Sequence, residues 1–246
     1  FEIEREIAGS LRPGLDHQVA HARLQWWREE CERCVSGRPA HPLTRALLAA
    51  FADAPRAGEL EGLTGLVDTA TWDLAGATFE SRRELTAYCG RWAAAIAQPI
   101  VRHSTSAEVD WRTVGVALCE LEQLIRVDRE ALAGHIRLPL DELQAAGVES
   151  EALAHPPWPP PLAHLLAERH AKLRATLAQA VDGLAPEQQR SLRGLLVWAR
   201  LCAKLSERAQ RSLPAIPAQR RRDSLAATWQ AWDTARRAAN GRLRLA

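Results

Sequence analysis

Residues 115–143 read GVALCELEQLIRVDREALAGHIRLPLDEL, and the prediction of the fold starts from this stretch. Glu122, Arg126 and Glu130 follow at i, i+4 and i+8, a spacing that makes opposite charges neighbours along a helix. The pattern predicts a helix over residues 108–133 that buries one face. That face carries apolar residues with the 3.6-residue period of an α-helix, namely Val114, Ala117, Leu118, Leu121, Leu124 and Ile125.

The rest of the chain has the same helical character. Its 246 residues are rich in Ala, Leu, Arg and Glu, which are good helix formers, and strand-like alternation is almost absent. A chain of this length is near the upper limit for one hydrophobic core, so we expect an all-α protein with a single domain over residues 1–246. Further helices are expected over residues 1–10, 15–36, 41–53, 58–76, 81–102, 139–146, 160–182, 186–211 and 217–240.

Segments upstream of residue 115 have a recognisable order and spacing. Together with residues 115–143 they resemble the squalene and phytoene synthase family, most closely over residues 1–150. In that family a Gly-x-Ala helix is followed by an Asp-x-x-x-Asp run, a glycine turn and a Leu-Pro pair. The upstream segments are Arg23-Leu24-Gln25-Trp26-Trp27-Arg28-Glu29-Glu30, then Gly37 and His41-Pro42, then Asp73-Leu74, Glu84-Leu85, Tyr88-Cys89 and Ala93.

The resemblance implies an isoprenoid-synthase-type helical bundle around a central cavity. In such a bundle two facing aspartate clusters hold Mg²⁺ ions, which need hard oxygen ligands and help a diphosphate to leave. Aligned on Gly115 and Leu138-Pro139, the expected aspartates of the second cluster fall on Arg126 and Glu130. A shift by one residue aligns Arg126 with the family's arginine and Asp128 with an aspartate. Either alignment leaves the cluster incomplete.

The first aspartate cluster should precede Arg23, where residues 1–10 read FEIEREIAGS. No Asp-Asp-x-x-Asp occurs there. Glu2 and Glu6 share a helical face and are candidate ligands for one hard cation. The alternative is that acidic residues here complement the positive end of a helix dipole. Both expected metal clusters therefore depart from the family pattern.

The chain keeps the order and spacing of the family's motifs but lacks both complete aspartate clusters. In this it is similar to the non-catalytic branch of the family that includes the mitochondrial complex I assembly factor. The first functional hypothesis is therefore a catalytically degenerate protein that binds an isoprenoid, another lipid or a partner protein, without a cofactor. Arg126 would then take the place of a cation beside Glu122 and Glu130. The alternative for these three residues is a solvated row of ion pairs, each of small energetic value.

The second hypothesis is an active prenyl-diphosphate enzyme. It would be a head-to-head prenyltransferase or a prenyl diphosphate phosphatase. Its Mg²⁺ ligands would be Glu2, Glu6, Asp128 and Glu130, although Mg²⁺ demands near-octahedral geometry. For either hypothesis the resemblance implies that bound substrate contacts Tyr88, Glu122, Arg126 and Arg129.

Nine Trp residues stand beside one Tyr and three Phe. Because Trp packs in cores while its N–H reaches a partner, they favour either a solid core or an aromatic-lined cavity. A formal net charge of +2 gives no general attraction to nucleic acid. The segment Gln219-Arg220-Arg221-Arg222 near Trp229 and Trp232 predicts an exposed basic helical face. The alternative is peripheral contact with anionic lipid headgroups.

The cysteines and histidines indicate weaker possibilities. Cys31 and Cys34, and His17 and His21, have metal-ligand spacing, with free thiols and surface imidazoles as the alternatives. Five cysteines without a disulfide pattern suit a reducing compartment, so we expect a cytoplasmic protein. No apolar run reaches the roughly 18 residues of a transmembrane helix. The chain contains no Met, so we expect that residues precede its first residue.

Overall fold

The computed structural model describes residues 1–12, 14–51, 60–216 and 224–245. All regular structure in these residues is helical and none of it is strand, which confirms the all-α prediction. The arginines at 220–222 and the start of the helix expected over 217–240 lie outside the described residues. The α-helices are α1 (Glu2–Ala8), α2 (His17–Val35), α3 (Pro42–Ala50), α4 (Gly65–Leu74), α5 (Arg82–Ser104), α6 (Trp111–Ile125), α7 (Val127–Leu132), α8 (Leu140–Ala145), α9 (Pro160–Asp182), α10 (Pro186–Ser191), α11 (Arg193–Ser212) and α12 (Leu225–Ala239).

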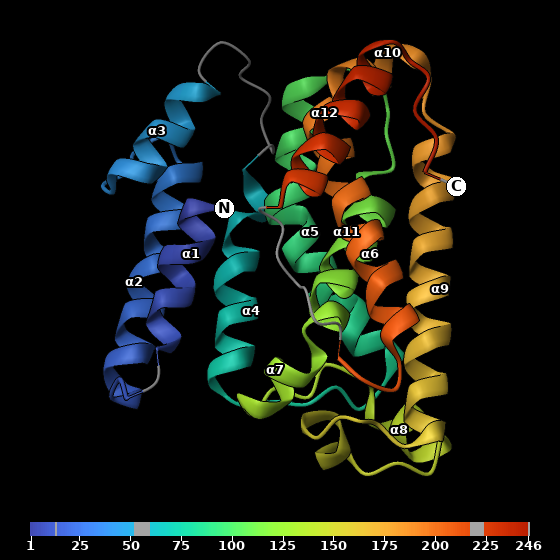
Figure 1. Ribbon diagram of the computed structural model, residues 1–246. Coiled ribbons are helices and arrows are strands. Elements are labelled where there is room, and N and C mark those ends of the chain that lie inside the picture. Colours follow the sequence, from blue (N-terminus) through green and yellow to red (C-terminus); the bar gives the residue numbers. More distant parts are fainter. Residues whose placement is uncertain (13, 52–59, 217–223, 246) are drawn as a thin grey trace.

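The long helices stand side by side. Figure 1 shows α5, α6, α9 and α11 as an upright bundle, with α4 against α5 and the layer α1–α3 beyond α4. The short helices α7 and α8 lie at one end of the bundle, and α10 lies at the other. Buried apolar side chains from Ile3 to Leu243 form one continuous cluster. The arrangement leaves α1, α4, α5, α6 and α11 to surround a common space.

Small residues let α6 approach α5 closely. A Cβ atom on Gly115 of α6 would lie 2.6 Å from the Cβ of Ala93 and 2.8 Å from that of Ala97, both on α5. The 3₁₀ turn Glu61–Thr64 uses Gly62 in the same way, because a Cβ there would lie 2.4 Å from the carbonyl oxygen of Ala94. Gly115, the first glycine of the stretch 115–143, is thus a packing residue.

The helix expected over residues 108–133 is divided. Arg126, with φ −113° and ψ 16°, separates α6 from α7, and its Nε donates to the carbonyl oxygen of Glu122 at 3.2 Å. Neither Gly nor Pro marks this position, so no local sequence signal indicates a break. The break turns α7 so that Val127 and Asp128 are buried. Packing, which outweighs the helix propensity of this segment, therefore sets where Glu130 lies.

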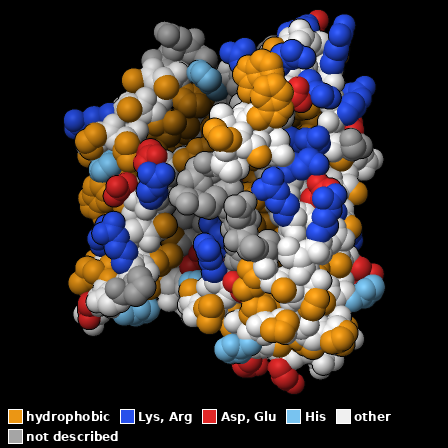
Figure 2. Space-filling view, in the orientation of Figure 1, with side chains coloured by type: hydrophobic (Ala, Val, Ile, Leu, Met, Phe, Trp, Pro, Cys, Tyr) orange, Lys and Arg blue, Asp and Glu red, His pale blue; other side chains and the backbone are white. Residues whose placement is uncertain are grey.

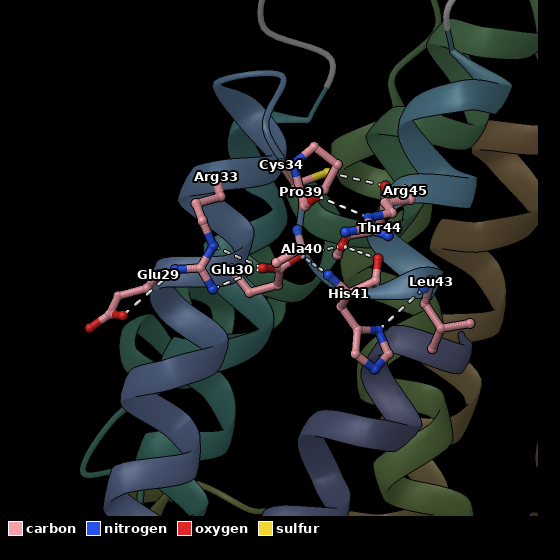
Figure 3. Close-up of polar contacts among 10 residues, drawn as sticks. All are labelled: Glu29, Glu30, Arg33, Cys34, Pro39, Ala40, His41, Leu43, Thr44 and Arg45. Atoms are coloured by element: carbon pink, nitrogen blue, oxygen red, sulfur yellow. Dashed lines mark hydrogen bonds and ion pairs between the residues drawn. The ribbon is translucent and has the colours of Figure 1, made fainter.

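A buried carboxylate fixes the turn between α2 and α3 (Figure 3). Glu30 Oε1 accepts hydrogen bonds from the backbone N–H of Ala40 at 2.9 Å, from that of His41 at 2.8 Å and from the hydroxyl of Thr44. Its other oxygen pairs with Arg33 at 2.8 Å. Burial acts to raise the pKa of Glu30, but the hydrogen bonds from Thr44, His41, Arg33 and Ala40 outweigh it and lower the pKa to about 2.

We expect Glu30→Gln to lower the free energy of unfolding by about 1–3 kcal/mol at pH 7, because an amide replaces an acceptor of charge-assisted bonds. The folded-state pKa of Glu30 is depressed, so its contribution is complete above the unfolded value of 4.5 and is lost as the pH falls toward 2. Urea unfolding of both proteins between pH 7 and pH 2.5 measures this. A difference that stays constant over that range would contradict the assignment. Glu32→Gln, an exposed change on the same helix, is the control.

Candidate functional site

A cavity of about 830 Å³ lies between α1, α4, α5, α6 and α11. Its volume is within the ~300–1,000 Å³ typical of small-molecule sites. Helix α4 presents Leu66, Ala70 and Asp73 to it. Residues 66 and 73 are about 10 Å apart along a helix that rises 1.5 Å per residue. The cavity therefore has an apolar end near Leu66 and a polar end near Asp73.

The apolar end is aromatic. The rings of Trp92 and Trp198 lie 5.6 Å apart between centroids, and Phe1 meets Trp198 edge to face at 5.1 Å. Ile7 and Leu66 complete this part of the wall. Of the two alternatives that the Trp content left open, the structure has the aromatic-lined cavity.

Arg137 occupies the centre of the polar end, with 6% of its side chain exposed. Its guanidinium pairs with Asp73 at 2.7 Å and with Glu130 at 2.9 Å, and it lies over the ring of Tyr88, 5.5 Å from the centroid. The Tyr88 hydroxyl donates to Asp73 Oδ2 at 3.1 Å. Burial raises the pKa of Tyr88 well above its ordinary value, so the phenol keeps the proton that it donates.

The two other carboxylates that line the cavity are also hydrogen-bonded. Glu4 Oε1 accepts from the indole N–H of Trp92 at 2.6 Å. Glu122 Oε1 accepts from the indole N–H of Trp198 at 3.0 Å and from the thiol of Cys202 at 3.0 Å. These two carboxylates thus link α1 to α5 and α6 to α11 in the wall of the cavity.

Other polar side chains also line the cavity. Gln123 lines the cavity and donates to the sulfur of Cys119 at 3.5 Å, while its buried Oε1 has no hydrogen-bond partner in the structure. Arg126 and His135 also line the cavity, as does Arg5, which pairs with Glu2. A buried acceptor without a partner is costly, so the site favours a ligand or water that donates to Gln123.

The structure brings some of the expected substrate contacts together. Tyr88, Glu122 and Arg126 all line the cavity. Arg129 is exposed on α7 and is not part of the lining. The expected row of charges along one helix is not continuous, since Glu130 follows the break at Arg126 and takes Arg137 as its ion-pair partner.

The four candidate metal ligands are dispersed. Glu130 lines the cavity, whereas Asp128 is buried in α7 away from the lining. Glu2 is exposed and pairs with Arg5 at 2.8 Å. Glu6 lines a separate hollow of about 190 Å³ beside Trp26, Trp27 and His41. Helix α1 brings Glu4 to the cavity in place of either expected acid.

The donor set does not fit a Mg²⁺ ion. Within the described residues, no three His, Cys, Asp or Glu side chains form a group that could hold a metal. Mg²⁺ needs near-octahedral oxygen ligands that include one or two free carboxylates, and Asp73 and Glu130 already share the guanidinium of Arg137. The permanently charged guanidinium of Arg137 occupies the position between these two carboxylates that a metal cation would have to take.

The remaining metal-spaced pairs lie apart from the cavity. The Nε2 atoms of His17 and His21 are 3.0 Å apart on the exposed face of α2. Cys31 and Cys34 are buried free thiols, and burial raises the pKa of Cys31 to about 12 and that of Cys34 to about 11. Both cysteines are therefore neutral packing residues at physiological pH.

Sequence reasoning missed the central residue of the site. Arg137 lies just before the Leu-Pro pair that carried the resemblance, yet no charge pattern linked it to Asp73, which is 64 residues away. Glu4 could have been found, because Phe1, Glu4, Arg5 and Ala8 lie on one face of a helix and all four line the cavity.

Among the described residues, no helix has the length and apolar character required to cross a membrane.

Comparison with known proteins identifies one family. The family model described as squalene/phytoene synthase matches residues 5–229. A crystal structure of a dehydrosqualene synthase in complex with ligand superposes with a TM-score of 0.72 and 16% identity, covering 95% of this chain and 84% of that chain. At this identity the likeness shows the isoprenoid-synthase-type helical fold and nothing further. No curated protein matches the chain.

Proposed function

The chain belongs to the squalene/phytoene synthase family, and on that premise we propose that it is a catalytically degenerate member that binds an isoprenoid or a similar lipid in its cavity. The observation that carries this proposal is the position of Arg137 between Asp73 and Glu130. A binding role without prenyl transfer is also what the likeness to the non-catalytic branch implies.

The charge at the polar end argues for binding without metal. Metal-assisted departure of a diphosphate needs carboxylates that are open to cations. Here an arginine that cannot lose its proton is the ion-pair partner of both carboxylates from within the protein. Adding a divalent cation would require Arg137, which is buried, to leave. Breaking a buried ion pair of this kind is strongly unfavourable.

The shape of the cavity indicates the class of ligand. Trp92, Trp198 and Leu66 form an apolar end suited to a branched hydrocarbon chain. The polar end offers Gln123 as a hydrogen-bond acceptor and Arg126 as a cation. An isoprenoid with a hydroxyl or anionic head group satisfies both ends. The superposed dehydrosqualene synthase structure is a complex with a ligand, which supports a binding role for this fold.

The second candidate is an active prenyl-diphosphate enzyme. One observation favours it: Asp73 and Glu130 both contact the same guanidinium, so the two carboxylates lie close together at the polar end. A displacement of Arg137 would leave them as a pair facing the cavity. The two candidates differ in whether Mg²⁺ strengthens ligand binding and whether a product forms.

Calorimetric titration with farnesyl diphosphate and with farnesol, each with and without Mg²⁺, separates the candidates. We expect an affinity that Mg²⁺ does not increase, and no product in the same mixtures. Binding that requires Mg²⁺ and leads to turnover would establish the active enzyme instead. Failure of both compounds to bind would remove the isoprenoid class.

Filling the cavity gives a direct control on where the ligand binds. Ala70 is buried and faces the cavity, so we expect Ala70→Phe to weaken farnesol or farnesyl diphosphate binding by at least about tenfold, because the ring takes up ligand space. Ala46→Phe adds the same ring on the exposed face of α3, outside the cavity, and should leave binding unchanged. Equal binding by both variants would place the ligand elsewhere.

A further inference from the structure

Helix α12 packs with its small residues inward and its aromatic residues outward. Its buried positions are Ala227, Thr234 and Ala238. The opposite face carries Leu225, Trp229 and Trp232, whose exposed fractions are 91%, 65% and 51%. Both sets follow a helical spacing, and the two stripes lie about 160° apart at 100° per residue. A helix that only covered the core would have the reverse arrangement.

The outward stripe forms one continuous surface. The rings of Trp229 and Trp232 lie 4.9 Å apart, and the guanidinium of Arg236 lies 5.3 Å over Trp232. In Figure 2 hydrophobic side chains are exposed over α12, with Lys and Arg side chains gathered beside them. Single exposed apolar residues are ordinary, but contiguous large ones mark an interaction site.

The positive charge of the chain is concentrated in the C-terminal segment that contains α12. Residues 193–246 hold twelve of the 32 Lys and Arg but three of the 30 Asp and Glu. Arg236, Arg237, Arg242 and Arg244 are exposed around the end of α12. The remainder of the chain is therefore acidic overall, although the formal net charge of the whole is only +2. The exposed arginines at the end of α12 place positive charge next to the aromatic stripe.

We infer that the face of α12 formed by Leu225, Trp229, Trp232 and Arg236 docks on the surface of an anionic lipid bilayer. Trp side chains favour the interface between headgroups and acyl chains, and nearby arginines attract anionic headgroups. An amphipathic helix with these features lies in the plane of the interface without crossing the bilayer. These residues do not line the cavity, so a test of bilayer docking is independent of a test of the proposed ligand site.

Co-sedimentation with vesicles tests the inference. We expect the protein to bind vesicles of equal parts phosphatidylglycerol and phosphatidylcholine. Binding should be at least about tenfold weaker to pure phosphatidylcholine and in 0.5 M NaCl, because salt screens the arginines. Absence of binding to the anionic vesicles at low salt, or equal binding to both compositions, would overturn the inference.

Paired variants locate the contact. Trp229→Ser with Trp232→Ser should reduce binding to the anionic vesicles at least about tenfold, whereas Trp26→Ser, an exposed Trp on α2, should not. Arg236→Glu should weaken binding more than Arg38→Glu, which reverses an exposed charge far along the chain. If the double Trp variant binds like the native protein, the face is not the contact. A different outcome is that the native protein forms a dimer in sedimentation velocity and does not bind vesicles, whereas the double Trp variant is monomeric. In that case the face of α12 binds a second copy of the chain and the inference is wrong.

Discussion

Arg137→Met is expected to lower the free energy of unfolding by about 3–5 kcal/mol, the cost of leaving buried charges without their partner. The guanidinium is the ion-pair partner of both Asp73 and Glu130 and is almost fully enclosed. Methionine replaces much of the length of the side chain, so loss of charge and not loss of volume dominates.

The same variant should acquire a response to divalent cations. With Arg137 removed, Asp73 and Glu130 present a carboxylate pair to the cavity, and Mg²⁺ can supply the missing positive charge. We expect millimolar MgCl₂ to raise the melting temperature of Arg137→Met but not that of the native protein. Thermal unfolding of both proteins with and without MgCl₂ measures this difference.

Two controls make that result interpretable. Arg38→Met removes an exposed arginine and should change stability by less than about 0.5 kcal/mol. Combining Arg137→Met with Asp73→Asn and Glu130→Gln removes the charge imbalance and should recover part of the lost stability. If the single variant is as stable as the native protein, Arg137 does not stabilise Asp73 and Glu130 in the way that the ion-pair distances indicate.

The second large effect is expected at the contact between α5 and α6. Gly115→Ala should lower the free energy of unfolding by about 1–3 kcal/mol, and Gly115→Leu should prevent folding. The alanine Cβ would overlap Ala93 and Ala97, whose Cβ atoms lie 2.6 and 2.8 Å from its position, so the helices must separate. Intrinsic helix propensity alone would predict the opposite sign, since alanine is the better helix former.

Gly194→Ala provides the matched comparison. Gly194 is also helical, in α11, but no heavy atom lies within 4 Å of its added Cβ. The substitution should stabilise the protein by about 0.5–1 kcal/mol through reduced backbone entropy. Urea unfolding of the two variants compares the same chemical change with and without crowding. Equal effects at both positions would show that the close approach at Gly115 is not maintained in solution.

Helical periodicity made most of the fold predictable. The stripe from Val114 to Ile125 identified α6, and the helix expected over residues 160–182 has those bounds in α9. The break at Arg126 could not be predicted, because its cause is the burial of Val127 and Asp128 after the chain has folded. The break also separates Glu122 from Glu130, so that Glu122 accepts from Trp198 while Glu130 pairs with Arg137.

The site was predictable in part for the same reason. Tyr88, Glu122 and Arg126 came from motif positions that the fold preserves, and all three line the cavity. Arg137 and Asp73 meet only through tertiary structure, so neither spacing nor local charge pattern could pair them. The assignment of Glu2 and Glu6 assumed a helical face that turns away from the cavity.

The two indoles at the apolar end give the protein an optical property of its own. Trp92 and Trp198 lie 5.6 Å apart with their planes inclined at 60°, so their electronic transitions couple and are fixed in a chiral arrangement. Such a pair produces a strong near-ultraviolet circular dichroism band. Because both rings form the wall of the cavity, a molecule that enters it perturbs this band. Occupancy can thus be followed spectroscopically on the unlabelled protein.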